Sequence, residues 1–452
     1  MWAEQGKLDL GLHMSDKWNS SEFGNTSGGG TQKPINLKEG GKKLVSAIVL
    51  GHSVSHVFNS SLPLLLAMMK TDPRFNLTAT QFGVVGGVGK GASDATTMVA
   101  GYLGERFANR PGAMLSISLI IMGSSYFLLG MAPSFWWLLG AMLLVGIGPS
   151  LYHPPAIAEL SKRFPGRRGF AVSLHGTGGS IGEMLGPFMA GLLTTETFKV
   201  GSIITITYLI AFEWNELLKI SVLPALIFAV LVYLMMRNVS KETSETSSSG
   251  EYFKGLRGLL KVKGIWGLIL VTGLSDMGLS SVTYFLPLYL ISAPGDGGLG
   301  KDTLTVGFFL AGAQVAGIIA QPVMGWLSDM YGRKIVLLPA MTFLGILFIG
   351  LYFTADGYLL VLNVFAMGAF LYSLHTVFIA AAMDVSGGKS QATVVSLIYS
   401  ASLLGTASPI FTGLLIDEFG LKSAFLFSGI ISLLATILLF SIKLPMSVDI
   451  TD

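Results

Sequence analysis

The amino-acid sequence predicts an all-α membrane protein with twelve transmembrane helices in two pseudo-symmetric six-helix bundles. The 452 residues are 51% hydrophobic and only 12% charged, which is too apolar for a soluble domain of this length. Apolar runs of about 20 residues, enough to cross a bilayer, recur along the chain. A short polar turn also occurs twice, beginning at Gly101 and again at Gly325, which indicates an internal repeat.

Residues 1–42 are rich in Gly, Ser, Asn and Lys and contain no apolar run that could insert into a membrane. This composition predicts a disordered cytoplasmic tail without a cleaved signal peptide. Twelve spans are then predicted near 43–69, 80–104, 112–131, 135–158, 168–194, 214–236, 264–291, 304–327, 335–354, 358–384, 390–416 and 422–443.

These spans divide the chain into bundles over 43–236 and 264–443, joined by a cytoplasmic linker over 237–263 and followed by a cytoplasmic tail over 444–452. With the N-terminus inside, the inner loops and flanks hold 20 Lys and Arg residues and the outer loops six. This asymmetry predicts that both termini are cytoplasmic, in a multi-pass protein of the cell (inner or plasma) membrane. Residues 200–212 are apolar but too short and β-branched to cross, so we expect an outer insertion, either a hairpin or a lid.

The repeated turn holds several charges within a few residues of a glycine. Its second copy contains Gly325, Asp329, Arg333 and Lys334, and Gly332 can supply the positive φ of a tight turn. In the first copy the corresponding residues are Gly101, Glu105 and Arg110.

This turn resembles the loop between the second and third helices in each half of major facilitator superfamily transporters, whose pattern is Gly-x-x-x-Asp-x-x-Gly-Arg-Arg/Lys. The first copy departs from it at Glu105, Ala108 and Asn109. The resemblance implies that the turn is a conformational hinge that latches the two halves together on the cytoplasmic side. A parallel repeat of six spans also places the substrate site between the halves near the middle of the membrane.

Ionisable residues inside the spans are candidates for substrate or proton binding, because burying a charge in the bilayer is costly. His52, His56 and Asn59 share one face of the first helix. His52 matches Asp276 at the repeat offset, so we expect a base and an acid that face each other across the cavity and carry a proton. The alternative is that these groups only hydrogen-bond neighbouring helices.

Two further predicted spans carry ionisable residues. Lys90 and Asp94 are four residues apart, so they can form an ion pair or separate to receive an anion. Residues 145–155 hold three prolines and two glycines, which predicts an irregular span. Tyr152 and His153 in that stretch are expected to line the transport path, unless the kink only shapes packing.

The fifth span carries a stripe of small residues beside an acidic one. His175, Gly178, Gly182 and Gly186 follow helical spacing, which allows another helix to approach closely, and Glu183 lies beside them. Gly182, Gly186 and Pro187 are similar to the helix-5 motif of proton-coupled antiporters of the superfamily. Together with Tyr152-His-Pro154, the loop at 167–169 and the glycines at 178–182, they resemble the branch of fosmidomycin-resistance efflux proteins.

The second half offers hydrogen-bonding groups that could orient a ligand. Tyr284, Gln314 and His375 are the main candidates, and Gln321 and Tyr372 are two further ones. Each residue taken alone is more often a packing contact between helices.

These observations favour a secondary active transporter that works by alternating access and exports a small organic solute in exchange for protons. The alternative within this class is a proton-coupled uptake symporter or a uniporter, for which an anionic metabolite would suit the basic residues. A second hypothesis is an intramembrane enzyme using His153 or His175 with Glu183, but the sequence has no nucleophile motif and no His-Glu-x-x-His spacing. It also has no P-loop, which argues against an ATP-driven pump.

The sequence therefore predicts no enzyme activity, no catalytic residue, no cofactor and no bound metal. Because the basic residues lie in short loops, nucleic acid is not an expected partner. We expect a monomer whose partners are the substrate, protons and the lipid bilayer.

Overall fold

The computed structural model describes residues 40–106, 110–164, 168–200, 204–207, 211–237, 257–262, 264–386, 401–442 and the single residues 394, 397, 398 and 444. The predicted tail up to residue 39, most of the linker 237–263 and the tail after residue 444 lie outside these ranges, so their predicted disorder stays a prediction. Residues 40–42, which we assigned to the tail, form the first turn of a helix instead.

The first half contains six membrane-crossing segments, two of them divided. They are α1 (Gly40–Thr71), α2 (Ala79–Arg106), α3 (Pro111–Gly130), α4 (Phe135–Ser150) continued by α5 (His153–Arg163), α6 (Arg168–Thr194), and α7 (Trp214–Ile220) continued by α8 (Val222–Met236). Their starts follow from local chemistry. Pro111 opens α3, where its missing N–H is not needed, and the Ser134 hydroxyl accepts a hydrogen bond from Trp137 N at the start of α4.

The second half repeats this plan. It contains α10 (Ile265–Ile291), the short η2 (Pro294–Asp296), α11 (Thr303–Tyr331), α12 (Arg333–Phe353), α13 (Tyr358–Leu371) continued by α14 (Leu374–Ser386), η3 (Ser402–Ala407) leading into α16 (Ser408–Phe419), and α17 (Ser423–Ser441). Asp302 caps α11 by accepting from Thr305 N at 2.8 Å.

The predicted irregularity of the fourth span is confirmed. A turn at residues 151–152 separates α4 from α5, with Pro149 inside the last turn of α4 and prolines at the first positions of α5. Prolines lack the N–H that would continue the helical hydrogen-bond ladder, so the segment breaks here.

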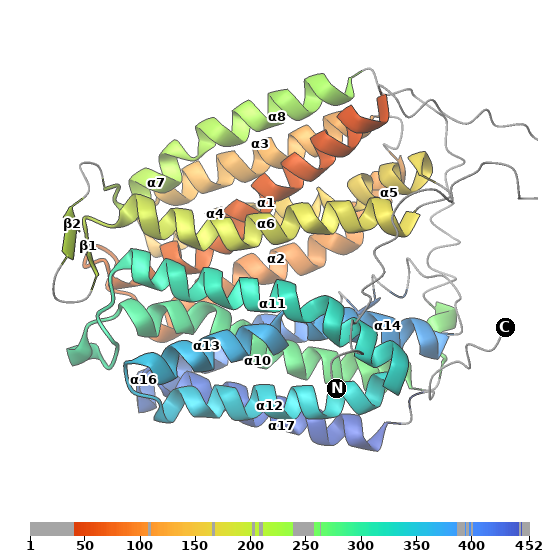
Figure 1. The fold of residues 1–452 in the computed structure, drawn as a ribbon. Coiled ribbons are helices and arrows are strands. Elements are labelled where there is room, and N and C mark those ends of the chain that lie inside the picture. The colour runs from red at the N-terminus through yellow and green to blue at the C-terminus, as the bar shows by residue number, and fades with distance from the viewer. Residues whose placement is uncertain are drawn as a thin grey trace, which may run out of the picture. The chain divides into compact units, whose positions relative to one another are not determined.

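The predicted insertion is a hairpin. Strand β1 (Thr197–Val200) pairs antiparallel with β2 (Ile204–Thr207), with Thr197 opposite Thr207 and Val200 opposite Ile204. Figure 1 shows this hairpin at one end of the helices. We call this the hairpin end; the Gly332 turn lies at the opposite end.

The two halves lie against each other along three pairs of helices, α1 with α10, α2 with α16 and α6 with α11. In Figure 1 the helices of the first half occupy the upper part of the view and those of the second half the lower part. Contacts within the halves follow the same scheme, because α2 packs on α4 as α11 packs on α13, and α3 packs on α8 as α12 packs on α17. The architecture is therefore two related six-helix bundles.

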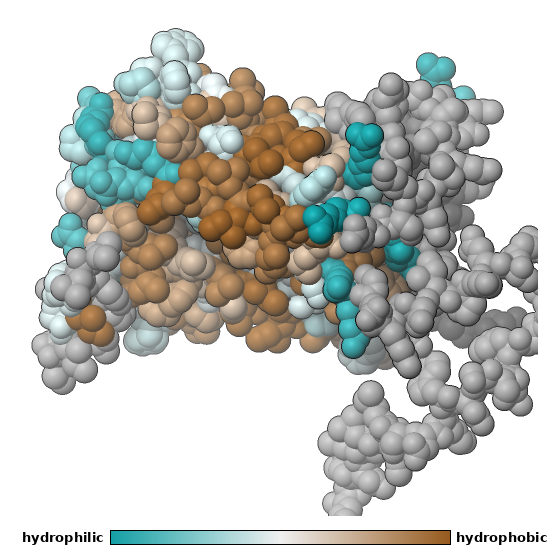
Figure 2. Space-filling view, turned by 90° about the horizontal axis from the view of Figure 1, so that it is seen from above, coloured by the Kyte–Doolittle hydropathy of each residue, from teal (hydrophilic) through white to brown (hydrophobic). Residues whose placement is uncertain are grey.

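The outer surface of the helices suits a lipid environment. Within the described residues, eight of the twelve predicted spans are long and apolar enough to cross a membrane. Figure 2 shows an apolar surface between hydrophilic residues near the two ends of the helices. Among the exposed side chains of α8, those of Leu223, Ile227, Val230 and Leu234 recur every three or four residues and form a stripe. In a soluble protein such a stripe would be unfavourable, whereas lipid chains cover it at no cost.

Candidate functional site

Three charged side chains meet where the halves touch, near the middle of α2 and α10. Lys90 Nζ lies 2.9 Å from Asp94 Oδ2 on the same helix and 3.0 Å from Asp276 Oδ2 on α10. The exposed fractions of the three side chains are 16%, 18% and 11%. Removing charges from water costs several kcal/mol each, so the group is held by mutual pairing. We call these residues the charge cluster.

Glycines make this close approach between the halves possible. Gly83, Gly87 and Gly91 recur every fourth residue on α2 and face the η3 and α16 segment; a side chain at Gly83 would overlap with the carbonyl of Pro409. At the site itself, a Cβ on Gly405 would overlap with Asp276 Oδ2. This second stripe of small residues was not predicted from the sequence, although glycines at four-residue spacing indicate a close helix contact.

Four histidines form a second group, inside the first half. The His52 ring stacks on His175 at 3.6 Å between centroids and meets His56 and His153 edge-on at 4.4 and 4.8 Å. His52 Nδ1 donates to the His175 carbonyl oxygen at 2.6 Å. His56 Nδ1 lies 3.0 Å from Glu183 Oε1, within ion-pair distance but without hydrogen-bond angles. We call the four rings the histidine cluster.

The glycine stripe on α6 explains why these rings gather. Side chains at Gly178, Gly182 and Gly186 would overlap with carbonyl oxygens of α1, those of Val49, Ser53 and Val57 respectively. The backbones of α1 and α6 therefore touch. This contact brings His52 of α1 against His175 of α6, and His56 of α1 against Glu183 of α6.

The expected pairing of His52 with Asp276 is wrong. His52 is 3% exposed, and the rings around it all belong to the first half, whereas Asp276 pairs with Lys90. The repeat offset does relate the two positions in sequence, but the contact between α1 and α6 turns His52 toward its own half.

Tyr152 also departs from its expected place beside the transport path. Its side chain is fully buried, and its hydroxyl donates to the carbonyl of Ile48 at 3.0 Å. Tyr152 therefore ties the break between α4 and α5 to α1. His153 contacts the other rings of the histidine cluster instead of lining an open path.

The remaining candidates lie on different helices, one in the first half and three in the second. Tyr284 on α10 faces Gly86 of α2, where an added Cβ would lie 3.0 Å from its ring. Gln314 on α11 is 8% exposed, and His375 on α14 is partly buried. Asn59 on α1 is exposed. Tyr284 and His375 lie within electrostatic range of Lys90 and Asp276, so these two residues belong to the surroundings of the charge cluster.

The polar turn at 325–334 fastens helices of its own half. Gly332 has a φ of +95°, as predicted for this position. Arg333 pairs with Asp329 and its Nε lies 2.9 Å from Asp384 Oδ2 of α14. Lys334 Nζ donates to two carbonyl oxygens at the end of α17, those of Phe440 and Ile442, at 2.7 Å each.

The expectation that this turn latches the two halves is therefore not met among the described residues, because every recorded partner lies in the second half. In the first copy, the surroundings of Gly101 and the side chain of Glu105 lie outside what the structure describes, and Arg110 is exposed at the start of α3.

The halves are fastened to each other at the hairpin end. Asp417 of α16 accepts hydrogen bonds from Ala79 N at 2.7 Å, Thr80 N at 2.9 Å and Thr80 Oγ1 at 2.6 Å, all at the start of α2. Thr195 and Thr303 share a hydrogen bond of 2.7 Å between the ends of α6 and α11. These residues were not predicted from the sequence, because a carboxylate at the end of a span does not indicate which residue it pairs with.

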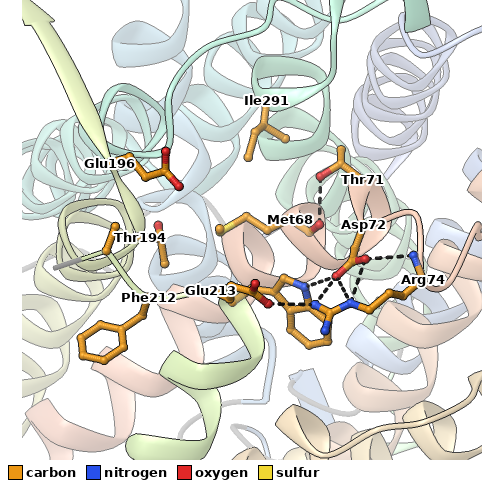
Figure 3. Close-up of a pocket in the computed structure, with 11 residues that line it drawn as sticks. Met68, Thr71, Asp72, Arg74, Thr194, Glu196, Phe212, Glu213 and Ile291 are labelled. Atoms are coloured by element: carbon orange, nitrogen blue, oxygen red, sulfur yellow. Dashed lines mark hydrogen bonds and ion pairs between the residues drawn. The ribbon is translucent and has the colours of Figure 1, made fainter. Parts of the chain in front are cut away.

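A separate hollow of about 520 Å³ also opens at the hairpin end. Figure 3 shows Asp72 and Arg74 at its edge, where Asp72 Oδ2 accepts from Arg74 Nη2 at 2.5 Å and from Trp214 Nε1 at 2.8 Å. The hydrogen bonds from Arg74 and Trp214 lower the pKa of Asp72 to about 2. Neither the charge cluster nor the histidine cluster lines this hollow.

Comparisons with known proteins agree with this architecture. The family model of the Major Facilitator Superfamily matches residues 48–303 and 297–449. The fosmidomycin resistance protein of Escherichia coli (strain K12) is 30% identical over 150 residues, which cover 33% of this chain and only 36% of that protein. A multi-drug resistance efflux pump PmrA homolog of Lactococcus lactis is 24% identical, covering 63% of this chain and 66% of the relative.

Two solved structures share the fold at low sequence identity. The nucleoside transporter NupG has a TM-score of 0.69 at 14% identity, covering 88% of this chain and 100% of that one. A bacterial homolog of the human lysosomal transporter Spinster, in an inward-facing and occupied conformation, also gives 0.69, at 17% identity, covering 90% and 97%.

Proposed function

The chain belongs to the Major Facilitator Superfamily, and we propose that this membrane transporter exports a small organic solute in exchange for protons. The observation that carries the proposal is the charge cluster, because it is the place where a carboxylate of one half and an ammonium group of the other meet inside the membrane. Names of two relatives support the direction: one confers fosmidomycin resistance and the other is a multi-drug efflux pump.

The charge balance of the cluster favours proton binding. One lysine and two aspartates leave one surplus negative charge when all three are ionised. Inside a membrane an unbalanced charge is costly, so the cluster gains from taking up one positive charge. A proton on Asp276 or a cationic group of a substrate would provide it, and the two would then compete for one site.

This competition gives a mechanism for exchange. When Asp276 is ionised, Lys90 bridges α2 and α10 and holds the halves together at this depth. A proton on Asp276 removes the attraction, while Lys90 keeps its bond to Asp94 and remains paired. The two halves can then move apart at this depth while Lys90 stays paired with Asp94. Protonation of Asp276 is thereby coupled to alternating access.

The proposal requires an orientation. We propose that the hairpin end faces outside and that both termini are cytoplasmic, because Lys and Arg residues are concentrated in the loops opposite the hairpin. The hydrogen bonds of Asp417 then close the outer side in this conformation. The domain boundaries at 43–236 and 264–443 are part of the same proposal.

The proposal can be tested in vesicles that contain the purified chain and a trapped pH-sensitive dye, with the organic cation ethidium as the probe, because the surplus negative charge of the cluster suits a positive group. We expect movement of the cation to drive protons the opposite way. Asp276→Asn should abolish both the proton movement and the transport of the cation, because the cluster then carries no surplus negative charge. Asp356→Asn, a change at an exposed carboxylate of the same half, is the control and should leave exchange intact.

Other outcomes contradict defined parts of the proposal. Unchanged proton movement in the Asp276→Asn variant contradicts the role of the cluster. Protons that move together with the probe would identify a symporter, and transport without any proton movement a uniporter. Absence of transport of the cation would contradict the inference that the cluster exchanges a proton for a positively charged solute.

A further inference from the structure

The histidine cluster has no part in the exchange mechanism above, and its geometry indicates a different ligand. We propose that His52, His56 and His153 bind a divalent transition-metal ion of the Zn²⁺ class between α1 and the start of α5. Each residue offers one ring nitrogen, and the three nitrogens lie within 4.8 Å of one another. Ligands of one tetrahedral ion lie about 3.3 Å apart at usual Zn–N distances, so small ring rotations would complete the site.

The hydrogen bonding of His52 fits a metal ligand. A carbonyl oxygen can only accept, so the bond to the His175 carbonyl places the proton of His52 on Nδ1. Its Nε2 then carries a lone pair, which is buried and has no hydrogen-bond partner in the described structure. Metal-binding histidines are usually oriented in this way: one ring nitrogen donates to a carbonyl oxygen or carboxylate, and the other ring nitrogen binds the ion.

His56 has a matching partner in Glu183. The carboxylate lies 3.0 Å from His56 Nδ1, which leaves Nε2 for the ion. Glu183 also supplies a negative charge that balances the cation at this depth. Its side chain is 34% exposed and that of His56 16%, so an ion can reach the cluster from this side.

Gly179 keeps the rings in position. A Cβ at residue 179 would lie 2.7 Å from His52 Cε1 and 3.3 Å from His56 Nε2, closer than the rings allow without moving. The space that glycine leaves is therefore part of the site.

The donor set identifies the chemical class of the ion. Neutral imidazoles suit Zn²⁺, Co²⁺ or Ni²⁺, whereas Mg²⁺ and Ca²⁺ require oxygen ligands. Three ring nitrogens leave one position of a tetrahedral ion for water or a substrate group. The sequence did not predict this site, because His52 and His56 share one helical face but the third ligand, His153, is distant from them in the chain.

The test is a Co²⁺ titration of the full chain, purified in detergent without a polyhistidine tag and treated first with a chelator. We expect one Co²⁺ per chain with the visible absorption of a tetrahedral site, displacement of Co²⁺ by Zn²⁺, and no effect of Mg²⁺. Because this readout needs no transport, its result is independent of the proposed exchange.

Variants separate the site from unspecific binding. His56→Gln should weaken Co²⁺ binding by at least about tenfold, and Glu183→Gln by about tenfold, as outer-shell partners of metal ligands do. His375→Gln alters a histidine outside the cluster and is the control. His56 and Glu183 are both partly exposed, so we expect the two variants to fold. Zn²⁺ should raise the unfolding temperature of the wild type but not that of His56→Gln. Equal Co²⁺ binding by His56→Gln and the wild type, or no binding by the wild type, would overturn the proposal.

Discussion

At the scale of single residues, Lys90 shows how one side chain can serve both halves. It is paired with Asp94 along α2 and with Asp276 across the interface, so it has a partner whether or not the halves stay in contact. The sequence predicted the first of these pairs from the four-residue spacing. It did not predict the second, because nothing local relates residue 90 to residue 276.

Asp72 provides a residue-scale prediction about pH. Its pKa is lowered to about 2 from 3.8, so its hydrogen bonds stabilise the folded chain fully above pH 3.8 and this contribution is lost as the pH falls toward 2. We expect Asp72→Asn to lower stability at pH 7 by about 1–2 kcal/mol, since Arg74 is itself half exposed to solvent and its effect is screened. The measurement is the unfolding temperature in detergent at several pH values.

For this prediction the difference between wild type and Asp72→Asn should be constant from neutral pH down to about 5 and should shrink below about 4. A difference that stays the same at low pH would show that Asp72 acts by packing alone. Thr71→Ala, a neighbouring change that removes no charge, is the control.

At the scale of elements, the sequence predicted that some helix packs closely on α6, but it did not predict that this helix is α1. The stripe His175, Gly178, Gly182 and Gly186 indicated that some helix approaches α6 closely, and the break in the fourth span followed from its prolines. Which helix fills the stripe depends on packing between distant segments. For the insertion after α6 the sequence left two alternatives, a hairpin or a lid. The structure has the hairpin, in which the β-branched residues 204–207 pair with β1.

The stripe leads to a prediction about helix packing. Gly182→Ala should destabilise the chain by about 1–3 kcal/mol, because its Cβ would overlap with the carbonyl of Ser53 and force α1 away from α6. Gly176→Ala is a matched control on the same helix, since a Cβ there meets no atom within 4 Å. Thermal unfolding in detergent would measure both. An equal change in the two variants, with no extra loss in Gly182→Ala, would mean that only the helical propensity matters, and α1 would then not be in close contact.

At the scale of the whole molecule, the sequence predicted twelve spans, the repeat and the linker, since these depend on hydrophobic length and internal similarity. The observed helices agree to within a few residues at most ends, and they extend further where polar residues reach beyond the lipid, as in α11, which ends at Tyr331 instead of near 327. The contacts between the halves could not be predicted. These contacts depend on which end of the molecule is closed between the halves, and this differs from one conformation of a transporter to another.

The closure at the hairpin end gives a prediction for the whole molecule. Asp417→Ala removes three hydrogen bonds to the start of α2, so the closed conformation should lose roughly 1–2 kcal/mol, about a tenfold change in population. The chain contains no cysteine, so Thr195→Cys introduces a single thiol where the halves meet. A membrane-impermeant thiol reagent should label it faster in the Asp417→Ala background.

Glu418→Ala is the matched control, because this carboxylate is exposed and adjacent to Asp417. Equal labelling rates in the Asp417→Ala and Glu418→Ala backgrounds would mean that other contacts hold this end closed.

The touching backbones of α1 and α6 also supply a reference length for spectroscopy. Two probes attached to these helices should keep the same separation in every working state, since helices in direct backbone contact cannot slide past each other. A second pair placed on α2 and α16 would report the opening and closing movement. Comparing the two separations in one sample would distinguish rigid rocking of the bundles from bending within them.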